Sequence, residues 1–419
     1  MKLLFVIGNV YPYDDANSMI IMRICRELKR IDHDIDLYLL GRGEDNGQVN
    51  LDGINIIRFT EDKEKQSSKW LREFFDNYRD TSLPRKAIQL LKNPIGMAEY
   101  ILNKISTKKS WIQYQHAIQE ISRDINFDAI IGVSFPFHTC TAIVKSKINL
   151  PFVYYQLDPY ASHYLNNKRM IRLLEESNVC KRASLIIMTD LIYKDYKNNI
   201  LKRYLRRSLV MGFPAIEQMD LNTRPRDEQI RMLYLGTMYY DIRSPLAFLK
   251  LVNIIVNEGF NIRVDFVGPI EGTPSEEVSH YLDLLKNYVY YHGRVSAKNA
   301  KEWIERSDVL INIGNSIRNQ IPSKLFEYFS SGKPIINCYK IDDCPSLQYT
   351  DRYPHCINIR DNQDLDKELI SHIYDLLMEY IENPIQYEMI ECLFPDFTIK
   401  EVGETFYEAL GHLISFPDQ

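Results

Sequence analysis

The segment from Asn319 to Ile336 concentrates the residues whose types and spacing suit ligand binding. Ser323 precedes a predicted helix and Gly332 follows it, and these residue types commonly begin and end helices. A helix that follows a parallel strand turns its first N–H groups and its positive dipole end toward the strand ends, which suits a diphosphate. Glu327, four residues beyond Ser323, lies on nearly the same helix face, where its carboxylate can accept hydrogen bonds from a ribose diol. The alternative for Glu327 is a solvated surface carboxylate.

This segment belongs to the second of two series of apolar strands. The predicted strands cover residues 2–7, 35–40, 54–59, 129–133, 152–155, 185–188 and 209–211, then 231–236, 262–268, 289–293, 309–314 and 334–339. Strands without polar alternation, separated by helical patterns, indicate parallel sheets covered on both faces. The break between the two series, residues 212–228, carries two prolines and mixed charge. We therefore predict an α/β fold with Rossmann-like domains at 1–212 and 228–385, followed by helices at 386–419.

Length and composition agree with two soluble domains. The 419 residues are too many for one ordinary core, and 45% of them are hydrophobic and 26% charged. A net charge of −5 argues against a general nucleic-acid binder. The first apolar run is too short for a secretory signal, and no run approaches the ~20 apolar residues of a membrane span. Seven cysteines without zinc spacing suit reduced thiols, so we expect a cytoplasmic protein.

The first half contains a predicted helical insertion at about 62–124 that is unusually basic. Between Pro84 and Ile112, six basic residues accompany one acid, Glu99. The basic residues are Arg85, Lys86, Lys92, Lys104, Lys108 and Lys109. One interpretation is a solvated amphipathic helix pair. The other is a surface that rests on anionic lipid at the inner face of the cell membrane, or that receives an acceptor carrying a lipid diphosphate.

The segment PSKLFEYFSSGKPII resembles the donor-site helix of GT-B glycosyltransferases, specifically the retaining family 4 group. LGTMYYDIRSP is similar to that family's Gly-Arg-Leu…Lys-Gly strand and loop, FVGP to its central glycine turn, and YHGRVSAKNAKEWIERSDVLIN to its base-binding region. FPDFTIKEVGETFYEAL resembles the last helix, which crosses back to the N-terminal domain. The resemblance implies the GT-B architecture, with the acceptor on the domain of residues 1–212 and the nucleotide-sugar on that of 228–385.

The resemblance also implies a set of nucleotide-sugar contacts. They fall on Gly8, Gly236, Thr237, Arg243, Gly268, Gly293, Arg294, Asn319, Pro322, Ser323, Lys324, Leu325 and Glu327. Two positions depart from the family pattern. Its first Glu is Asn319 here, which can hydrogen-bond a hydroxyl but supplies no negative charge. The Arg of Gly-Arg-Leu is Thr237, whereas the family's Lys aligns with Arg243.

Cleavage of a sugar nucleotide leaves negative charge on the diphosphate and positive charge on the sugar ring. Arg243 and Lys324 are the predicted catalytic cations for the diphosphate. The alternatives are a surface ion pair for Arg243 and a solvated lysine at the helix start for Lys324. Asp158 follows the apolar strand at 152–155 and precedes Pro159, so it is expected at a strand end facing the cleft. There it can accept the proton of an acceptor hydroxyl or stabilise the sugar cation, or it can simply be a turn residue. The resemblance implies retention of configuration and no need for a metal or other cofactor.

The sequence therefore predicts a retaining glycosyltransferase of surface-polysaccharide or cell-envelope assembly, with a UDP-sugar donor and a glycan or lipid-linked acceptor. A nicotinamide-dependent oxidoreductase is excluded because no Gly-x-Gly-x-x-Gly follows the first strand. Two alternatives remain: a non-catalytic partner subunit that only binds the nucleotide-sugar, which Asn319 and Thr237 keep open, and a sugar-nucleotide epimerase on the same fold.

Overall fold

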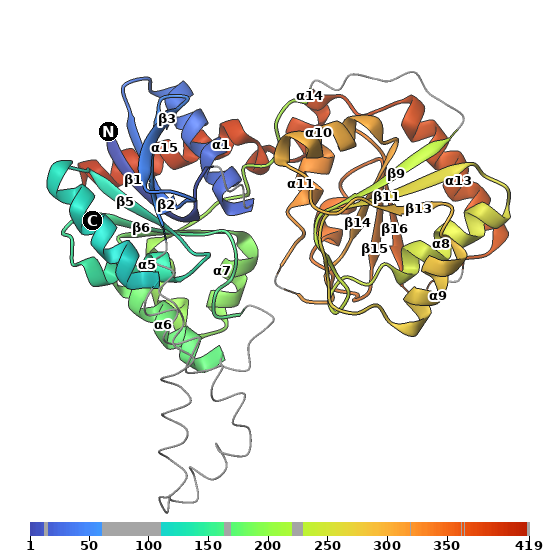
Figure 1. Ribbon diagram of the computed structural model, residues 1–419, viewed down its shortest axis with the longest axis horizontal. Coiled ribbons are helices and arrows are strands. Elements are labelled where there is room, and N and C mark those ends of the chain that lie inside the picture. The colour runs from blue at the N-terminus through green and yellow to red at the C-terminus, as the bar shows by residue number, and fades with distance from the viewer. Residues whose placement is uncertain are drawn as a thin grey trace, which may run out of the picture.

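The chain forms two α/β halves that lie side by side, each built around one sheet (Figure 1). A computed structural model describes residues 1–11, 16–60, 110–162, 169–219, 229–318, 320–361, 363 and 365–416. The predicted α/β fold with two mainly parallel sheets is confirmed. Most of the basic insertion lies outside the described residues, and only its continuation at 110–124 is described, as a helix.

The N-terminal sheet has eight strands in the order β3-β4-β2-β1-β5-β6-β7-β8. The strands are β1 (Lys2–Asn9), β2 (Asp36–Arg42), β3 (Gly47–Leu51), β4 (Ile54–Phe59), β5 (Ala129–Val133), β6 (Phe152–Gln156), β7 (Leu185–Met188) and β8 (Ser208–Val210). All neighbours pair in parallel except β3 and β4. The carboxyl ends of β1 and β5 to β8 therefore meet at one edge, toward the C-terminal half.

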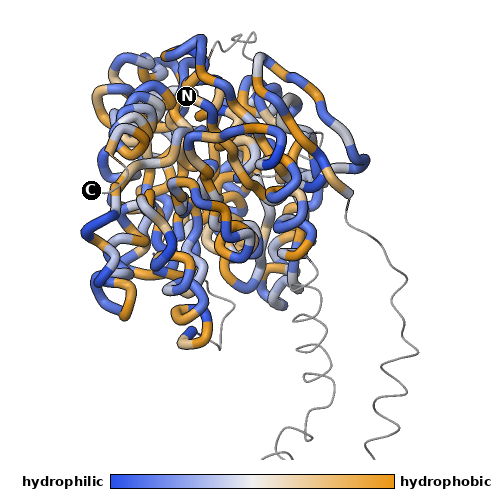
Figure 2. The backbone as a smooth tube through the Cα atoms, turned by 90° about the vertical axis from the view of Figure 1, so that its left-hand side faces the viewer, coloured by the Kyte–Doolittle hydropathy of each residue, from blue (hydrophilic) through white to orange (hydrophobic). Residues whose placement is uncertain are grey.

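Both faces of the N-terminal sheet are covered. Successive residues of a strand point to opposite faces, and in β1 both sets are buried. Leu3 and Phe5 pack into one buried cluster, and Leu4 and Val6 into another. The covering helices are α1 (Ala16–Ile31), α5 (His138–Ser146), α6 (Arg169–Arg182), α7 (Asp190–Lys197) and the 3-10 helix η1 (Ile200–Arg207). Figure 2 shows hydrophobic and hydrophilic stretches changing repeatedly along the tube, as amphipathic helices require.

The C-terminal sheet has six parallel strands in the order β13-β11-β9-β14-β15-β16. They are β9 (Ile230–Leu235), β11 (Ile262–Val267), β13 (Val289–Tyr291), β14 (Val309–Ile313), β15 (Ile335–Tyr339) and β16 (Cys356–Arg360), with a separate short pair, β10 (Met238–Tyr239) and β12 (Ile270–Glu271). The helices are α8 (Leu246–Asn257), α9 (Glu276–Leu284), α10 (Ala297–Arg306), α11 (Lys324–Phe329), α12 (Leu347–Thr350) and α13 (Lys367–Glu382). Successive residues of β9 again enter two different buried clusters.

The end of the chain returns to the N-terminal half. Helix α14 (Tyr387–Leu393) and the 3-10 helix η2 (Pro395–Phe397) lead into α15 (Ile399–Ser415), which packs beside α1 behind the N-terminal sheet (Figure 1). The ring of Phe406 stacks on Phe5 with centroids 6.1 Å apart. Where the chain crosses between the halves, the Ile399 amide donates to the Ile216 carbonyl at 3.0 Å. The two crossing segments are thus hydrogen-bonded to each other.

The predicted strands agree with the structure to within two residues, but two edge strands, β3 and β16, were missed. β3 pairs antiparallel with β4 after a turn in which Asp52 (φ 53°) and Gly53 (φ 77°) are both left-handed. β16 is a parallel edge strand in which only Ile359 is fully buried. Both carry polar residues, because an edge strand is only partly covered.

Candidate functional site

A cavity of about 310 Å³ lies between the two halves, where the strands of both sheets end. Ala16, Asn17 and Ile20 of α1 and Asp158 after β6 form its N-terminal wall. Among the predicted site residues, Asp158, Gly236, Thr237, Arg243, Pro322, Ser323 and Lys324 all line it. We call it the Arg243 cavity. Residues far apart in sequence therefore meet at one place, as expected where parallel strands end.

Arg243 is a fixed cation on the C-terminal wall. Its backbone N–H donates to the Tyr239 carbonyl at 2.7 Å, and its guanidinium lies over the Tyr239 ring, 5.6 Å from the centroid. Its Nε donates to the side-chain oxygen of Asn315, which is fully buried. The positive charge of Arg243 also opposes the rise that burial causes in the pKa of Tyr234. A cation held in this way needs little reorganisation to meet an anion.

Asp158 faces Arg243 from the other half of the molecule. The side-chain amide of Gln320 donates to Asp158 Oδ1 at 3.2 Å, and Asn315 donates to the Gln320 carbonyl oxygen at 2.9 Å. Burial raises the pKa of Asp158, while hydrogen bonds from Gln320 and Asn17 and the charge of Arg243 oppose the rise. A carboxyl group with a raised pKa is a better proton acceptor once ionised. Gln320 and Asn315 were not predicted, although Asn315 directly follows the strand predicted at 309–314.

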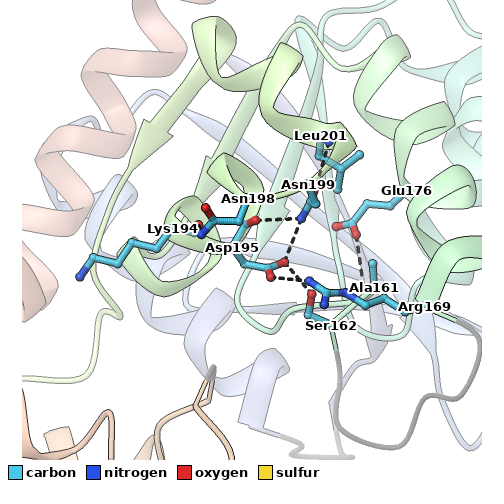
Figure 3. Close-up of polar contacts among 9 residues, drawn as sticks. All are labelled: Ala161, Ser162, Arg169, Glu176, Lys194, Asp195, Asn198, Asn199 and Leu201. Carbon is cyan, nitrogen blue, oxygen red and sulfur yellow. Dashed lines mark hydrogen bonds and ion pairs between the residues drawn. The ribbon is translucent and has the colours of Figure 1, made fainter. Parts of the chain in front are cut away.

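The loop that carries Asp158 is anchored to the body of the N-terminal half (Figure 3). The Ala161 amide donates to Glu176 of α6 at 3.2 Å, and the Ser162 hydroxyl donates to Asp195 of α7 at 2.6 Å. Arg169, on the other side of residues 163–168, also contacts Asp195, at 3.0 Å. Asp158 is therefore held between a strand end and two helices.

Glu327 lies in a smaller cavity beside the Arg243 cavity, together with Arg23 and Lys324. Its carboxylate accepts a hydrogen bond from Lys324 Nζ at 2.7 Å and lies 3.6 Å from Arg23 Nη1. Arg23 also lies 3.7 Å from Glu217. A ribose diol must therefore compete with two cations for Glu327, and Lys324 must leave Glu327 to meet a diphosphate.

The start of α11 differs from the prediction. The helix has six residues, and Ser323 precedes it without a capping hydrogen bond from its side chain. The amides of Leu325 and Phe326 donate within the turn, to Pro322 and Ser323. Leu325 is fully buried in the core. Its side chain therefore packs inward, so any role of Leu325 in binding is limited to its backbone. Gly332 has the left-handed conformation expected at a helix end, with φ 66°.

The predicted glycines shape strand ends at different places. Gly268 packs so closely on Gly236 that an added Cβ would lie 2.1 Å from the Gly236 carbonyl oxygen. The Gly268 amide donates to the Gly293 carbonyl at 2.7 Å, so these turns are linked. Gly8 packs against Pro136 at the end of β1. Gly8, Gly268 and Gly293 are not among the residues that line the Arg243 cavity.

The structure does not place Arg294 or Asn319 in the wall of the Arg243 cavity. Arg294 is exposed and does not line the cavity. Asn319 lies outside the described residues, as do Arg85, Lys86 and Lys92 of the basic insertion. Over the described ranges, no group of three His, Cys, Asp or Glu side chains could hold a metal ion. Within the same ranges, no helix is both long and apolar enough to cross a bilayer.

The chain has the GT-B fold, with similar solved structures matching over nearly its full length. One is the lipopolysaccharide outer core galactosyltransferase WaaB, with 12% identity, 98% of this chain and 99% of that chain covered, and a TM-score of 0.54. Another is Anabaena HepE in complex with UDP and glucose, with 11% identity, 98% and 99% covered, and a TM-score of 0.56. UDP-GlcNAc 2-epimerase from Methanocaldococcus jannaschii has 12% identity, 98% and 100% covered, and a TM-score of 0.52.

The sequence comparison found similarity over a shorter part of the chain. Protein CapJ of Staphylococcus aureus is 25% identical over 185 residues, which are 41% of this chain and 44% of CapJ. The matching region thus spans less than half of that relative. No protein-family profile matches the chain.

Proposed function

We propose that the protein is a glycosyltransferase that moves a sugar from a UDP-sugar to a glycan or lipid-linked acceptor, with retention of configuration and without a metal. The observation that carries the proposal is the Arg243 cavity, in which the Arg243 cation and the Asp158 carboxylate face each other from the two halves. Charge separation in a sugar nucleotide needs a cation at the diphosphate and a carboxylate near the sugar and acceptor, and this arrangement supplies both.

Similarity to HepE in complex with UDP and glucose supports the choice of uridine diphosphate. Similarity to WaaB, a lipopolysaccharide galactosyltransferase, supports a role in cell-envelope or surface-polysaccharide assembly. The basic insertion fits a lipid-linked acceptor at the inner face of the membrane. In this proposal Arg243 binds the diphosphate, Lys324 joins it after leaving Glu327, and Glu327 receives the ribose.

Calorimetry with UDP, GDP, ADP, CDP and NAD, in a buffer containing EDTA, tests the donor site. We expect UDP to bind and NAD not to bind. Binding of UDP only after a divalent cation is added would contradict the metal-independent part of the proposal. If none of the five nucleotides binds, the donor assignment is wrong.

An epimerase is the second candidate, since UDP-GlcNAc 2-epimerases share the fold. The two activities leave different products. An epimerase converts UDP-GlcNAc to an epimer without an acceptor, whereas a transferase releases UDP. Nuclear magnetic resonance of UDP-GlcNAc incubated with the protein distinguishes them. If the protein binds UDP but forms neither product with any donor or acceptor tested, it is the non-catalytic partner subunit.

A further inference from the structure

A second cavity, of about 330 Å³, lies between the halves where β6, β7 and β8 end. Helix α12 and the start of α15 form its other walls, through Tyr349 and Glu401 among others. We call it the Tyr349 cavity. The nucleotide-sugar contacts proposed above do not use this space, apart from its boundary with the Arg243 cavity.

That boundary is a shared wall. Asp158, Gln320 and Ile321 line both cavities. Because Gln320 donates to Asp158 Oδ1, the carboxylate is held at the boundary between them. A group in the Tyr349 cavity and a sugar in the Arg243 cavity can therefore both reach Asp158. This is the geometry that a transfer between two bound substrates requires.

Tyr349 gives the second cavity an unused polar group. Its side chain is 8% exposed, and its ring packs edge-on against the stacked rings of Phe326 and Phe397, at centroid distances of 5.0 and 5.2 Å. Its hydroxyl has no hydrogen-bond partner within the part of the chain that the structure describes. Burial raises the pKa of Tyr349 to about 12, and the charges of Asp190 and Asp396, which line the same cavity, contribute. Since Tyr349 lines the cavity, a ligand bound there can supply a hydrogen-bond partner for this hydroxyl.

The charges of the wall select the ligand. Asp158, Asp190, Asp396 and Glu401 are acidic, and Arg352 is the basic residue that lines the cavity among those described. The Arg352 guanidinium already donates to the Leu393 carbonyl and lies 4.9 Å from the centre of the Phe394 ring. Surplus carboxylates repel phosphate but accept hydrogen bonds from hydroxyl groups. The wall therefore fits a neutral or amine-bearing sugar ring and not a nucleotide.

We propose that the Tyr349 cavity binds the terminal sugar ring of the acceptor, with the reacting hydroxyl directed at Asp158. This inference rests on the proposed transferase function. In the transfer, the hydroxyl oxygen forms a bond to the anomeric carbon and its proton passes to the Asp158 carboxylate. The bond between the anomeric carbon and the diphosphate breaks, and its electron pair leaves with UDP. The diphosphate of a lipid-linked acceptor must then lie outside this acidic cavity.

The test measures binding of simple glycosides to the UDP-saturated protein by saturation-transfer NMR. The probes are methyl α-glucoside, methyl α-galactoside, N-acetylglucosamine and methyl β-glucosaminide. Gln348→Trp fills the cavity from an exposed position of α12, so the fold is expected to persist. Tyr349→Phe removes only the hydroxyl group. UDP affinity, measured by calorimetry, is the control for both variants.

We expect at least one glycoside to bind the wild type. The same glycoside should bind Gln348→Trp at least tenfold more weakly and Tyr349→Phe about threefold more weakly. The UDP affinity of both variants should stay within twofold of that of the wild type. Equal glycoside binding by wild type and Gln348→Trp, or no binding of any probe to the wild type, overturns the inference. A wild type that does not bind UDP instead contradicts the proposed function, so the two failures are distinguishable.

Discussion

Four residues connect the two halves across the Arg243 cavity, from Asp158 through Gln320 and Asn315 to Arg243. Gln320 uses its side-chain amide toward Asp158 and its backbone carbonyl toward Asn315. The two ends carry opposite charges, and the two middle residues are neutral amides that fix their positions. Such a chain keeps the cation and the carboxylate apart while holding both at the cavity. Their separation matters because a direct ion pair would neutralise the charges that the reaction needs.

At Glu327, the prediction concerns nucleotide binding. Glu327→Ala removes the proposed ribose acceptor and is expected to weaken UDP binding by about 1–3 kcal/mol, the usual cost of losing a charged hydrogen-bond partner. Glu217→Ala is the matched control, since Glu217 also contacts Arg23 but does not line either donor-side cavity. Calorimetry should show UDP affinity within twofold of wild type for the control. Equal losses in both variants would attribute the effect to Arg23.

At Asp158, the prediction concerns turnover and its pH dependence. Asp158→Asn is expected to lower the rate of sugar transfer by about 10²–10⁴-fold, the range for a lost general base, with UDP affinity unchanged. Since burial raises the pKa of Asp158, wild-type turnover should rise with pH through a pKa above that of an ordinary aspartate. The variant should lack this rise. A parallel loss of turnover and UDP affinity would instead make Asp158 a structural residue.

The site could be predicted from sequence only where residue type and position both carried a signal. Asp158, Arg243 and Lys324 follow apolar strands or precede a helix, and the structure brings them together. Gln320 was missed because an amide has no motif of its own, and its contact with Asp158 spans 162 positions. Leu325 was assigned to the site from its place in the motif, although helical periodicity turns it into the core.

At the scale of elements, an uninterrupted apolar run decided which strands could be predicted. β5 and β6 are buried at every residue, so their continuous apolar runs were recognised. β3 has no fully buried residue, and its pattern is mainly polar. The Asp52-Gly53 pair that joins it to β4 is a hairpin signal, which could have located this strand.

Helix α6 carries a buried acid, Glu176, which accepts a hydrogen bond from the loop after Asp158. Its ionisation is expected to affect the stability of the fold. Burial raises the pKa of Glu176 to about 7, against hydrogen bonds from Tyr196, Tyr154 and the Ala161 amide. Between pH 4.5 and 7 the folded state therefore binds more protons than the unfolded state, and stability falls as pH rises through this window.

Urea unfolding at several pH values measures the effect. The wild-type free energy of unfolding should decrease from pH 5 to about pH 7 and then level off with respect to this group. Glu176→Gln cannot ionise, so the difference in stability between variant and wild type should shift in favour of the variant as pH rises. Glu175→Gln, at an exposed neighbouring position, is the control and should leave the pH dependence unchanged. Parallel curves for wild type and Glu176→Gln would show that Glu176 is already ionised at pH 5.

At the scale of the whole molecule, the two halves are connected twice. The first crossing, near Ile216, and the return, near Thr398, form an isolated parallel bridge. The return helix was predicted from its resemblance to a family pattern, because its own periodicity shows a helix but not its destination. Its destination depends on the apolar surface that α1 and β1 leave uncovered, and a single sequence does not show which distant helix covers it.

Helix α15 is expected to contribute to the stability of the N-terminal half through Phe406. Phe406 of α15 is fully buried, stacks on Phe5 and packs 5.7 Å from the Tyr155 ring. Phe406→Ala leaves a cavity in the N-terminal core and should lower the free energy of unfolding by about 3–5 kcal/mol. Phe416→Ala, at the 52% exposed end of the same helix, is the control and should stay within about 0.5 kcal/mol of wild type. If the crossings couple the two halves, the protein unfolds in one transition. Phe406→Ala should lower the midpoint of that transition, and UDP should raise it. Two separate transitions, with UDP raising only the one that Phe406→Ala leaves unchanged, would show that the halves unfold independently.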